Sequence, residues 1–162
     1  MSIIRTDQQF PFLSQLAGRQ RTHSRTLHLE MIESNREISQ FLKLPIATPV
    51  YYLRCLCLLD EVPSVLERCW IVQKLAPGFA ARYNQESSDV CDLLKHAYSF
   101  SFFHGEEEIS IVAPSPEEQV LLPSQEYVRM QGVLLVNETT PVVYYDHLAL
   151  PELYVFSARE GG

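Results

Sequence analysis

The chain has 162 residues, of which 46% are hydrophobic and 20% are charged, a composition typical of one soluble globular domain rather than a disordered or membrane-spanning chain. Its 13 lysines and arginines stand against 20 aspartates and glutamates, which gives a net charge of −7. This acidity argues against direct binding to nucleic acid, because phosphate neutralisation needs clustered cations. We expect one domain over residues 1–162, with a core of about 10–157. The first residues lack the basic and apolar segments of a secretory signal, so we expect a cytoplasmic protein.

The first elements in chain order alternate between helical and extended patterns. Apolar spacing predicts a short helix over residues 10–17, and strict alternation predicts a strand over residues 26–32. Ser34 is followed three residues later by Glu37, a spacing typical of the capping box that opens a helix. We expect this helix to end at Pro45.

The middle of the chain predicts a β-hairpin followed by helices. Residues 50–59 and 62–72 are rich in β-forming side chains, and Asp60-Glu61 between them indicates a tight turn that lacks the usual glycine. A surface helical turn is predicted over residues 77–83. A firmer helix is expected after Ser88, where an acidic first turn favours the helix dipole.

The last third of the chain is mostly strand-like. A strand is predicted over residues 100–113, interrupted by three glutamates at 106–108 that we expect at a solvated edge or bulge. Ser115 and Glu118 form a second capping box, with proline at the first helical position. Further strands are predicted over residues 126–136, 142–150 and 153–156. Because hairpins cannot be parallel, the sequence predicts an α+β fold, a largely antiparallel sheet with helices packed on it.

Motifs for catalysis or cofactor binding are absent from the sequence. It contains no glycine-rich phosphate loop and no Gly-x-Ser-x-Gly elbow. The five histidines show no His-x-x-x-His spacing; they are His23, His28, His96, His104 and His147. We therefore expect no cofactor and no catalytic histidine.

The cysteines predict free thiols. Cys55, Cys57, Cys69 and Cys91 form no Cys-x-x-Cys pair, and a chain of this length can build a core without disulfides. Cys55 and Cys57 alternate on a predicted strand, so their side chains share one face. A soft metal site formed with His23 or His28 is the less favoured alternative.

Glu67 is the carboxylate that the pattern singles out, because most of its neighbours in the run 65–71 are apolar. A buried carboxylate must be paired or hydrogen-bonded. Two interpretations remain open. Glu67 either faces water or pairs with Arg54 across the hairpin, or it orients a ligand in a cleft.

An ordered set of segments now indicates a family. The segments are Phe12-Leu13 to Gly18, His23-Ser24-Arg25, Ile38 to Pro45, Pro49-Val50-Tyr51, Asp60-Glu61-Val62-Pro63, Glu67, Asp89 to Leu94, Pro141 to Tyr144 and Leu153 to Phe156. From about Phe10 to Phe156 the chain resembles the UTRA domain, the effector-binding half of HutC-type GntR transcription regulators. The resemblance implies a chorismate-lyase-like fold, a small-molecule pocket and a homodimer. It also implies an N-terminal winged helix-turn-helix domain for DNA binding, which we expect to be absent from this chain.

The resemblance also assigns candidate effector-binding residues. Many family members carry Arg-x-Arg on the first hairpin strand to hold an anionic effector, whereas this chain has Cys55-Leu56-Cys57. Arg54 is expected on the opposite face. At Val143 the chain lacks a carboxylate of the family, and Tyr145 and His147 share the face of that position. The full candidate set is His23, Ser24, Cys55, Cys57, Glu67, Ser88, Asp89, Tyr145 and His147.

Three hypotheses follow from the resemblance. In the first, the domain senses a small metabolite that is not a phosphate ester, since the bidentate cations are gone, and contacts DNA only through a separate N-terminal domain. In the second, it is a degenerate domain that only dimerises. The third and least favoured is a chorismate-lyase-like enzyme, which would need convergent cations for its dianionic substrate. No membrane partner is expected.

Overall fold

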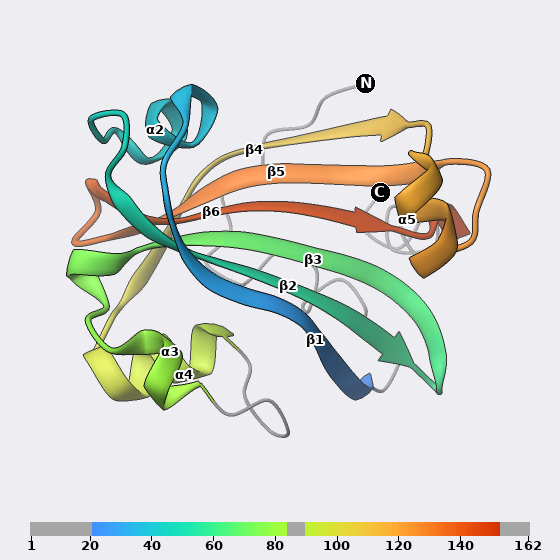
Figure 1. Ribbon diagram of the computed structural model, residues 1–162, viewed down its shortest axis with the longest axis horizontal. Coiled ribbons are helices and arrows are strands. Elements are labelled where there is room, and N and C mark those ends of the chain that lie inside the picture. Colours follow the sequence, from blue (N-terminus) through green and yellow to red (C-terminus); the bar gives the residue numbers. More distant parts are fainter. Residues whose placement is uncertain (1–20, 84–89, 153–162) are drawn as a thin grey trace.

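The computed structural model describes residues 21–83 and 90–152, with residues 21–23 described by their backbone alone. Its centre is one six-stranded sheet with the order β1-β2-β3-β6-β5-β4, and every neighbouring pair is antiparallel (Figure 1). The strands are β1 (Arg21–Glu33), β2 (Pro49–Leu59), β3 (Val62–Val72), β4 (Phe102–Val112), β5 (Tyr127–Val136) and β6 (Thr140–Ala149). The predicted α+β class with an antiparallel sheet is confirmed. The helix predicted over 10–17, the strand predicted over 153–156, and Ser88 with Asp89 lie outside the described residues.

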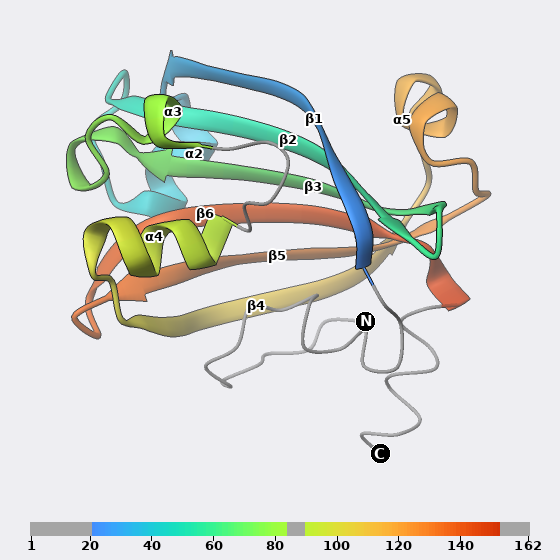
Figure 2. The same cartoon turned by 90° about the horizontal axis from the view of Figure 1, so that it is seen from below.

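Short helices cover the two faces of the sheet. They are α2 (Arg36–Leu42), the 3-10 helix η1 (Gln73–Leu75), α3 (Phe79–Arg82), α4 (Val90–Tyr98) and α5 (Pro116–Leu121). Figure 1 shows α2 at one end of the sheet and α5 at the other. In the view from below, α3 and α4 lie together over the end of the sheet that is away from α5 (Figure 2).

Alternation along the strands separates two faces of different character. The face that we call the α4 face carries Tyr51, Leu53, Cys55, Cys69 and Tyr145, which pack with Phe79 of α3 and Leu94 of α4. The opposite face, called the α5 face, has two clusters. Ile38 and Leu42 of α2 pack on one of them with Val50, Val72 and Tyr144, and Leu56, Leu66, Leu122, Tyr127 and Leu148 form the other beside α5. Because both faces bury apolar residues, the core is divided between the two sides of the sheet.

The start of α2 differs from the prediction. Asn35, not Ser34, is the N-cap, and its side chain accepts a hydrogen bond from the Ile38 amide at 2.9 Å. Ser34 is buried and bonds to the Ser39 hydroxyl at 2.8 Å instead. The helix ends before Pro45, because Lys43 adopts a left-handed φ of 54°. Both Asn and Ser are good caps, so local sequence alone does not decide between adjacent candidates.

Two hairpin turns form without glycine. Asp60 and Glu61 join β2 to β3 with φ of 51° and 67°, and Asn137 and Glu138 join β5 to β6 with φ of 54° and 67°. Two successive residues with positive φ are the backbone of a type I′ turn, whose twist matches that of the flanking strands. The predicted hairpin is therefore confirmed, and its polar turn residues accept a conformation that glycine adopts at lower cost.

The capping box at the start of α5 is confirmed. The Ser115 side chain accepts from the Glu118 amide at 3.2 Å, and the Glu118 carboxylate accepts from the Ser115 amide at 2.9 Å. The helix thereby satisfies two of the amides that its first turn leaves open. Its position matters for the site, because it places Glu117 and Glu118 above the α5 face of the sheet.

The seam between β3 and β6 is interrupted at its centre. The pairing runs through Leu66 opposite Leu148 and resumes at Cys69 opposite Tyr145. Between these points the Arg68 amide donates to His147 Nδ1 at 3.1 Å, and Arg68 Nε donates to the Asp146 carbonyl at 3.0 Å. Side chains therefore take the place of ladder hydrogen bonds in the middle of the sheet.

Candidate functional site

The centre of the α4 face holds a group of hydroxyls and a thiol from three elements. Thr26 of β1 stands opposite Cys55 of β2, and Tyr83 follows the last residue of α3. The Thr26 and Tyr83 hydroxyls are 3.1 Å apart, and the Cys55 sulfur lies 3.5 Å from the Tyr83 hydroxyl and 4.0 Å from Thr26 Oγ1. We refer to Thr26, Cys55 and Tyr83 as the hydroxyl–thiol triad. It offers hydrogen-bond donors and acceptors at one point of an otherwise apolar surface.

The triad stays uncharged at neutral pH. Burial raises the pKa of the Cys55 thiol, hydrogen bonds from Tyr83, Thr26 and Ser24 oppose the rise, and the Glu67 charge adds to it. Burial also raises the pKa of the Tyr83 hydroxyl, and its hydrogen bond with Cys55 raises it further. A buried thiol with a raised pKa is a poor nucleophile, so the geometry supports binding rather than covalent chemistry at Cys55.

Glu67 lies beside this triad. It is directly opposite Cys55 in the β2–β3 register, and its side chain is partly exposed on the α4 face. The alternative in which Glu67 pairs with Arg54 is wrong, because Arg54 lies on the other face and contacts Glu117 of α5 at 3.1 Å. Glu67 thus places a carboxylate next to three neutral polar groups.

A second carboxylate on the same face was missed by the sequence reasoning. The pairing of β4 with β5 shifts by one residue between His104 and Glu107, and this bulge turns Glu107 inward. Its side chain is 1% exposed, and Oε2 accepts a hydrogen bond from the Tyr145 hydroxyl at 2.7 Å. The prediction of a solvated acidic run is therefore wrong for Glu107, although the predicted bulge is present. An acidic triplet beside His104-Gly105 was the available signal.

Gly132 makes the contact between Tyr145 and Glu107 possible. It is opposite both residues, in β6 and β4 respectively. A Cβ at this position would meet Tyr145 Cζ at 2.7 Å and the Glu106 carbonyl at 3.0 Å. The tyrosine ring therefore crosses β5 in the space that a side chain would fill, which is a close approach that only glycine permits.

His147 connects the α4 face with the seam. Its ring lies 5.3 Å from the Tyr145 ring, as expected for two residues that share a face. Because Nδ1 accepts from the Arg68 amide at 3.1 Å, a neutral His147 carries its proton on Nε2. The ring is 1% exposed, so its hydrogen bond with the Arg68 amide lies inside the protein, at the centre of the sheet.

The structure brings most of the predicted site residues to one surface. Ser24 lies opposite Cys57, and the backbone of His23 lies opposite Leu58. Cys55 and Cys57 are 5% and 1% exposed, so both are packed against neighbours, and Glu67 is the more accessible group. Tyr145 and His147 lie across β3 from the cysteines. The roles of these residues in binding remain predictions, as do those of Ser88 and Asp89, which the structure does not describe.

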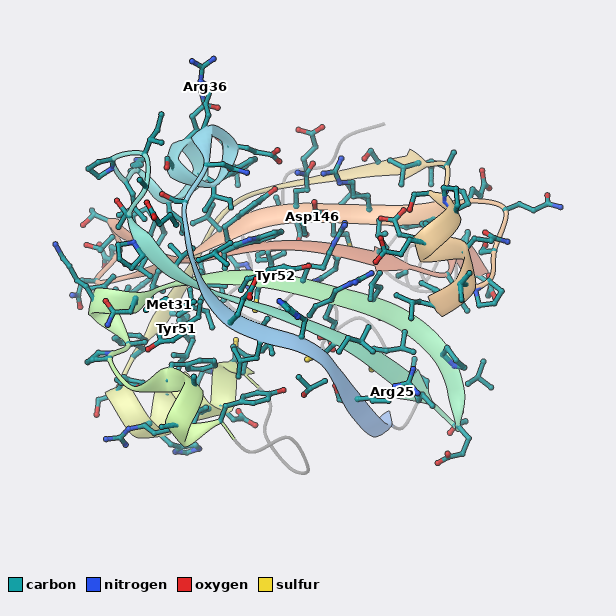
Figure 3. The ribbon with its side chains drawn as sticks, in the orientation of Figure 1. Arg25, Met31, Arg36, Tyr51, Tyr52 and Asp146 are labelled. Carbon is teal, nitrogen blue, oxygen red and sulfur yellow. The ribbon has the colours of Figure 1, made fainter. Side chains whose placement is uncertain are left out.

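The sheet sorts its charges between the faces. In the described sheet from Ser24 onward, alternation directs no lysine or arginine to the α4 face. The arginines of β2, β3 and β5 reach acidic partners on the α5 face; the closest ion pairs are Arg54 with Glu117 at 3.1 Å, Arg68 with Asp146 at 3.1 Å and Glu118 at 3.4 Å, and Arg129 with Asp146 at 2.7 Å. In Figure 3, Asp146 and Tyr52 lie on this side, whereas Tyr51 lies toward α3 and α4. From Ser24 onward, the α4 face of the described sheet thus presents the carboxylates of Glu67 and Glu107 and no lysine or arginine.

Metal binding and membrane insertion find no support in the described structure. Within residues 21–83 and 90–152, no group of three or more potential ligands among His, Cys, Asp and Glu is arranged to hold a metal ion. His28 lies 3.0 Å from Glu30, and its ring centroid is 5.8 Å from that of Tyr52 on the α5 face, away from Cys55. None of the helices described is both long enough and apolar enough to cross a membrane.

Comparison with known proteins supports the resemblance seen in the sequence. The family model described as the UTRA domain matches residues 17–150. Similar solved structures include the C-terminal domain of Yurk from Bacillus subtilis, with a TM-score of 0.73 at 18% identity, covering 79% of this chain and 90% of that one. The effector domain of PhnF from Mycobacterium smegmatis has a TM-score of 0.73 at 15% identity, with coverages of 80% and 81%. The longer PhnF chain is covered over 58% of its length. No curated protein matches the sequence.

Proposed function

Because this chain belongs to the UTRA domain family, we propose that it is the effector-sensing and dimerisation domain of a HutC-type GntR transcription regulator that acts in the cytoplasm. Residues 1–162 act as one ligand-binding domain, and a separate N-terminal domain contacts DNA. A metabolite bound on the α4 face favours one arrangement of the homodimer and so changes the spacing of two DNA-binding domains. Couplings of this kind are worth about 1–3 kcal/mol.

The placement of Glu67 beside the hydroxyl–thiol triad carries the proposal. These groups come from β1, β2, β3 and the end of α3, so they converge only in the folded domain. Ligand sites typically combine an apolar wall with a few convergent polar groups. Tyr51 and Phe79, whose ring centroids are 5.6 Å apart, belong to the same apolar cluster as Cys55. The remaining predicted residues, including Tyr145 and His147, belong to the same face.

The effector is not a phosphate ester. Phosphate recognition in proteins relies on bidentate arginine or on lysine, and the described part of the α4 face of the sheet presents neither. Cys55 and Cys57 stand instead on the hairpin strand, and both are buried. Bringing a dianion next to Glu67 would add repulsion between like charges.

A dimerisation-only domain is the second candidate, and one observation favours it. Cys55 and Cys57 are 5% and 1% exposed and packed against neighbours, as expected where a binding surface has been filled. Glu67 is partly exposed, which favours sensing. The enzyme hypothesis lacks cations on the α4 face, and chorismate incubated with the protein should yield no 4-hydroxybenzoate.

A metabolite screen by thermal unfolding tests the proposal. A ligand at one hundred times its dissociation constant stabilises the folded state by about 2.7 kcal/mol, which raises Tm by about 5–10 °C for a chain of this size. The shift should be lost in Glu67→Gln and retained in Glu108→Gln, a matched control whose side chain is exposed on the α5 face. Strong stabilisation by sugar phosphates alone would contradict the effector class. A stable dimer that no metabolite shifts would establish the second candidate.

A further inference from the structure

The α5 face keeps a partly exposed strip between its two helices. α2 lies at one end of this face and α5 at the other (Figure 1), and Tyr52 and Asp146 lie between them in Figure 3. We call this strip the central band. Its partly exposed members are Tyr52 and Arg54 of β2, Arg68 and Trp70 of β3, and Arg129 and Gln131 of β5. Tyr144 and Asp146 of β6, both buried, complete it.

The central band has the residue types that protein interfaces favour. Trp, Tyr and Arg are enriched in the most deeply buried parts of interfaces, whereas Lys is depleted. Trp70, the only tryptophan of the chain, stacks between Tyr52 at 5.1 Å and Tyr144 at 4.9 Å. No lysine lies on any of the described strands. Arg129 is held by both oxygens of Asp146, at 2.9 and 2.7 Å, so a partner meets side chains that are already ordered and loses little entropy in fixing them.

The charges of the central band cancel, in contrast to those of the whole chain. At a net charge of −7, two copies of the chain repel each other on average. The three arginines of the band are matched by three carboxylates at 2.7–3.4 Å, in the pairs Arg54–Glu117, Arg68–Glu118, Arg68–Asp146 and Arg129–Asp146. The exposed Glu30 and Glu108 lie on the outer strands β1 and β4. A second copy that meets the band therefore meets no net charge there.

The α5 face is also large enough for a stable dimer. Strands of ten residues at about 3.3 Å each, set about 4.8 Å apart across the six-stranded sheet, span about 950 Å². A stable interface takes about 800 Å² from each partner. Val120 of α5 is 80% exposed and offers an apolar contact next to the band.

We propose that the α5 face is the surface through which two copies of this chain associate, with the central band of each copy in the middle of the interface. This inference rests on the homodimer of the proposed function and assigns its surface. Effector sensing then takes place on the α4 face and association on the opposite one. Arg68 connects the two, because its amide donates to His147 and its side chain reaches Glu118 and Asp146.

Sedimentation and the fluorescence of Trp70 test the surface on the full chain. Analytical ultracentrifugation over a dilution series gives the dissociation constant of the dimer. As the dimer dissociates, Trp70 should become more accessible, so quenching of its fluorescence by acrylamide should rise over the same range of concentration. A dimer that dissociates without any change in the quenching of Trp70 overturns the proposal.

Two substitutions of exposed apolar side chains locate the interface. Val120→Glu changes a side chain that is 80% exposed, so the variant should fold normally, and it should weaken association at least tenfold. Met31→Glu is the matched control. Met31 is 59% exposed and stands opposite Tyr51 of the α4 face, so this variant should change the dissociation constant less than threefold.

A charge exchange tests the balance of the band. Arg54→Glu should weaken association at least tenfold, because each band then carries two additional negative charges. Adding Glu117→Arg should restore most of the affinity, because the band is balanced again. Lys95→Glu in α4 makes the same change in net charge as Arg54→Glu and should have less than a threefold effect. Circular dichroism and thermal unfolding check that each variant folds.

The outcomes separate this inference from the proposed function. If Met31→Glu or Lys95→Glu weakens the dimer and Val120→Glu does not, the homodimer stands and the α5 face is the wrong surface. A chain that stays monomeric at high micromolar concentration overturns both the surface and the dimerisation, while the metabolite screen still decides the sensing role. If a separate GntR-type DNA-binding domain protects Trp70 of a monomeric chain from acrylamide, the face belongs to that domain and the proposal is overturned.

Discussion

Gly132→Ala is expected to destabilise the domain by forcing Tyr145 away from Glu107. The added methyl group would lie 2.7 Å from Tyr145 Cζ and 3.0 Å from the Glu106 carbonyl, well inside van der Waals contact. Overpacking of this kind costs about 1–3 kcal/mol. If the ring moves, the 1% exposed Glu107 carboxylate loses the hydroxyl that donates to it, which costs about 1–3 kcal/mol more.

The combined loss is about 4 kcal/mol at the middle of these ranges, or about 8–16 °C in Tm for a domain of this length. Urea unfolding followed by tryptophan fluorescence measures it, since Trp70 lies on β3 in the same sheet. A double-mutant cycle isolates the cause. In a Tyr145→Ala background the ring is gone and only the contact with the Glu106 carbonyl remains, so Gly132→Ala should cost clearly less than in the wild-type background.

Gly105→Ala is the matched control, because its added Cβ would meet the Val133 carbonyl at 3.2 Å and no side chain closer than 3.7 Å. It should cost clearly less than Gly132→Ala. The reasoning is refuted if Gly132→Ala lies within 0.5 kcal/mol of the wild-type protein, a threshold set by ordinary surface substitutions. An equal penalty with and without the Tyr145 ring would also refute it.

Three further predictions concern the α5 face, the triad and α5. Asp146→Ala should lower the free energy of unfolding in urea by about 3 kcal/mol, because Arg68 and Arg129 both lose Asp146, whose side chain is 7% exposed. Glu117→Gln should lower it by less than about 0.5 kcal/mol, because the Glu117 side chain is 75% exposed. The Cys55 pKa is raised from 9.0, so the folded state favours the neutral thiol. The contribution of Cys55 to the free energy of unfolding is complete below pH 9 and is lost as the pH rises through the folded-state pKa. Urea unfolding at a series of alkaline pH values should therefore show a weaker pH dependence in Cys55→Ala than in the wild-type protein. Ser115→Ala should cost about 1 kcal/mol through loss of the cap, measured by thermal unfolding.

The hairpin was predictable because two local signals agree. Alternation in residues 50–59 and 62–72 matches β2 and β3 to within one residue, and the same alternation placed Arg54 on the face opposite Cys55. The turn at Asp60-Glu61 followed from polarity alone. Where the alternation of side chains and the turn residues both favour the same hairpin, the local preferences agree with the fold and the hairpin can be predicted from the sequence.

The inward turn of Glu107 was not predictable, because a bulge reverses the face of every residue that follows it. Three successive glutamates look solvated by composition, and the partner that stabilises the middle one, Tyr145, is distant in sequence. The cap at Asn35 escaped prediction for a different reason. Ser34 and Asn35 are both good caps, and the choice depends on the loop contacts of Ser34 with Ser39 and the Thr48 amide.

The gap in the pairing of β3 with β6 affects how the domain folds and where it opens locally. Strands β1 to β3 occupy residues 21–72, and β4 to β6 occupy residues 102–149, so each half of the sheet is a contiguous segment of chain. Within a half, the strands that pair are neighbours in sequence, whereas the strand pair that joins the halves is β3 with β6. We expect each half to form first and the halves then to dock along β3 and β6, and we expect local opening to begin where Arg68 and His147 bond outside the ladder. Cys55 and Glu67 belong to the first half and Tyr145 to the second, so a ligand that contacts both halves would hold them together.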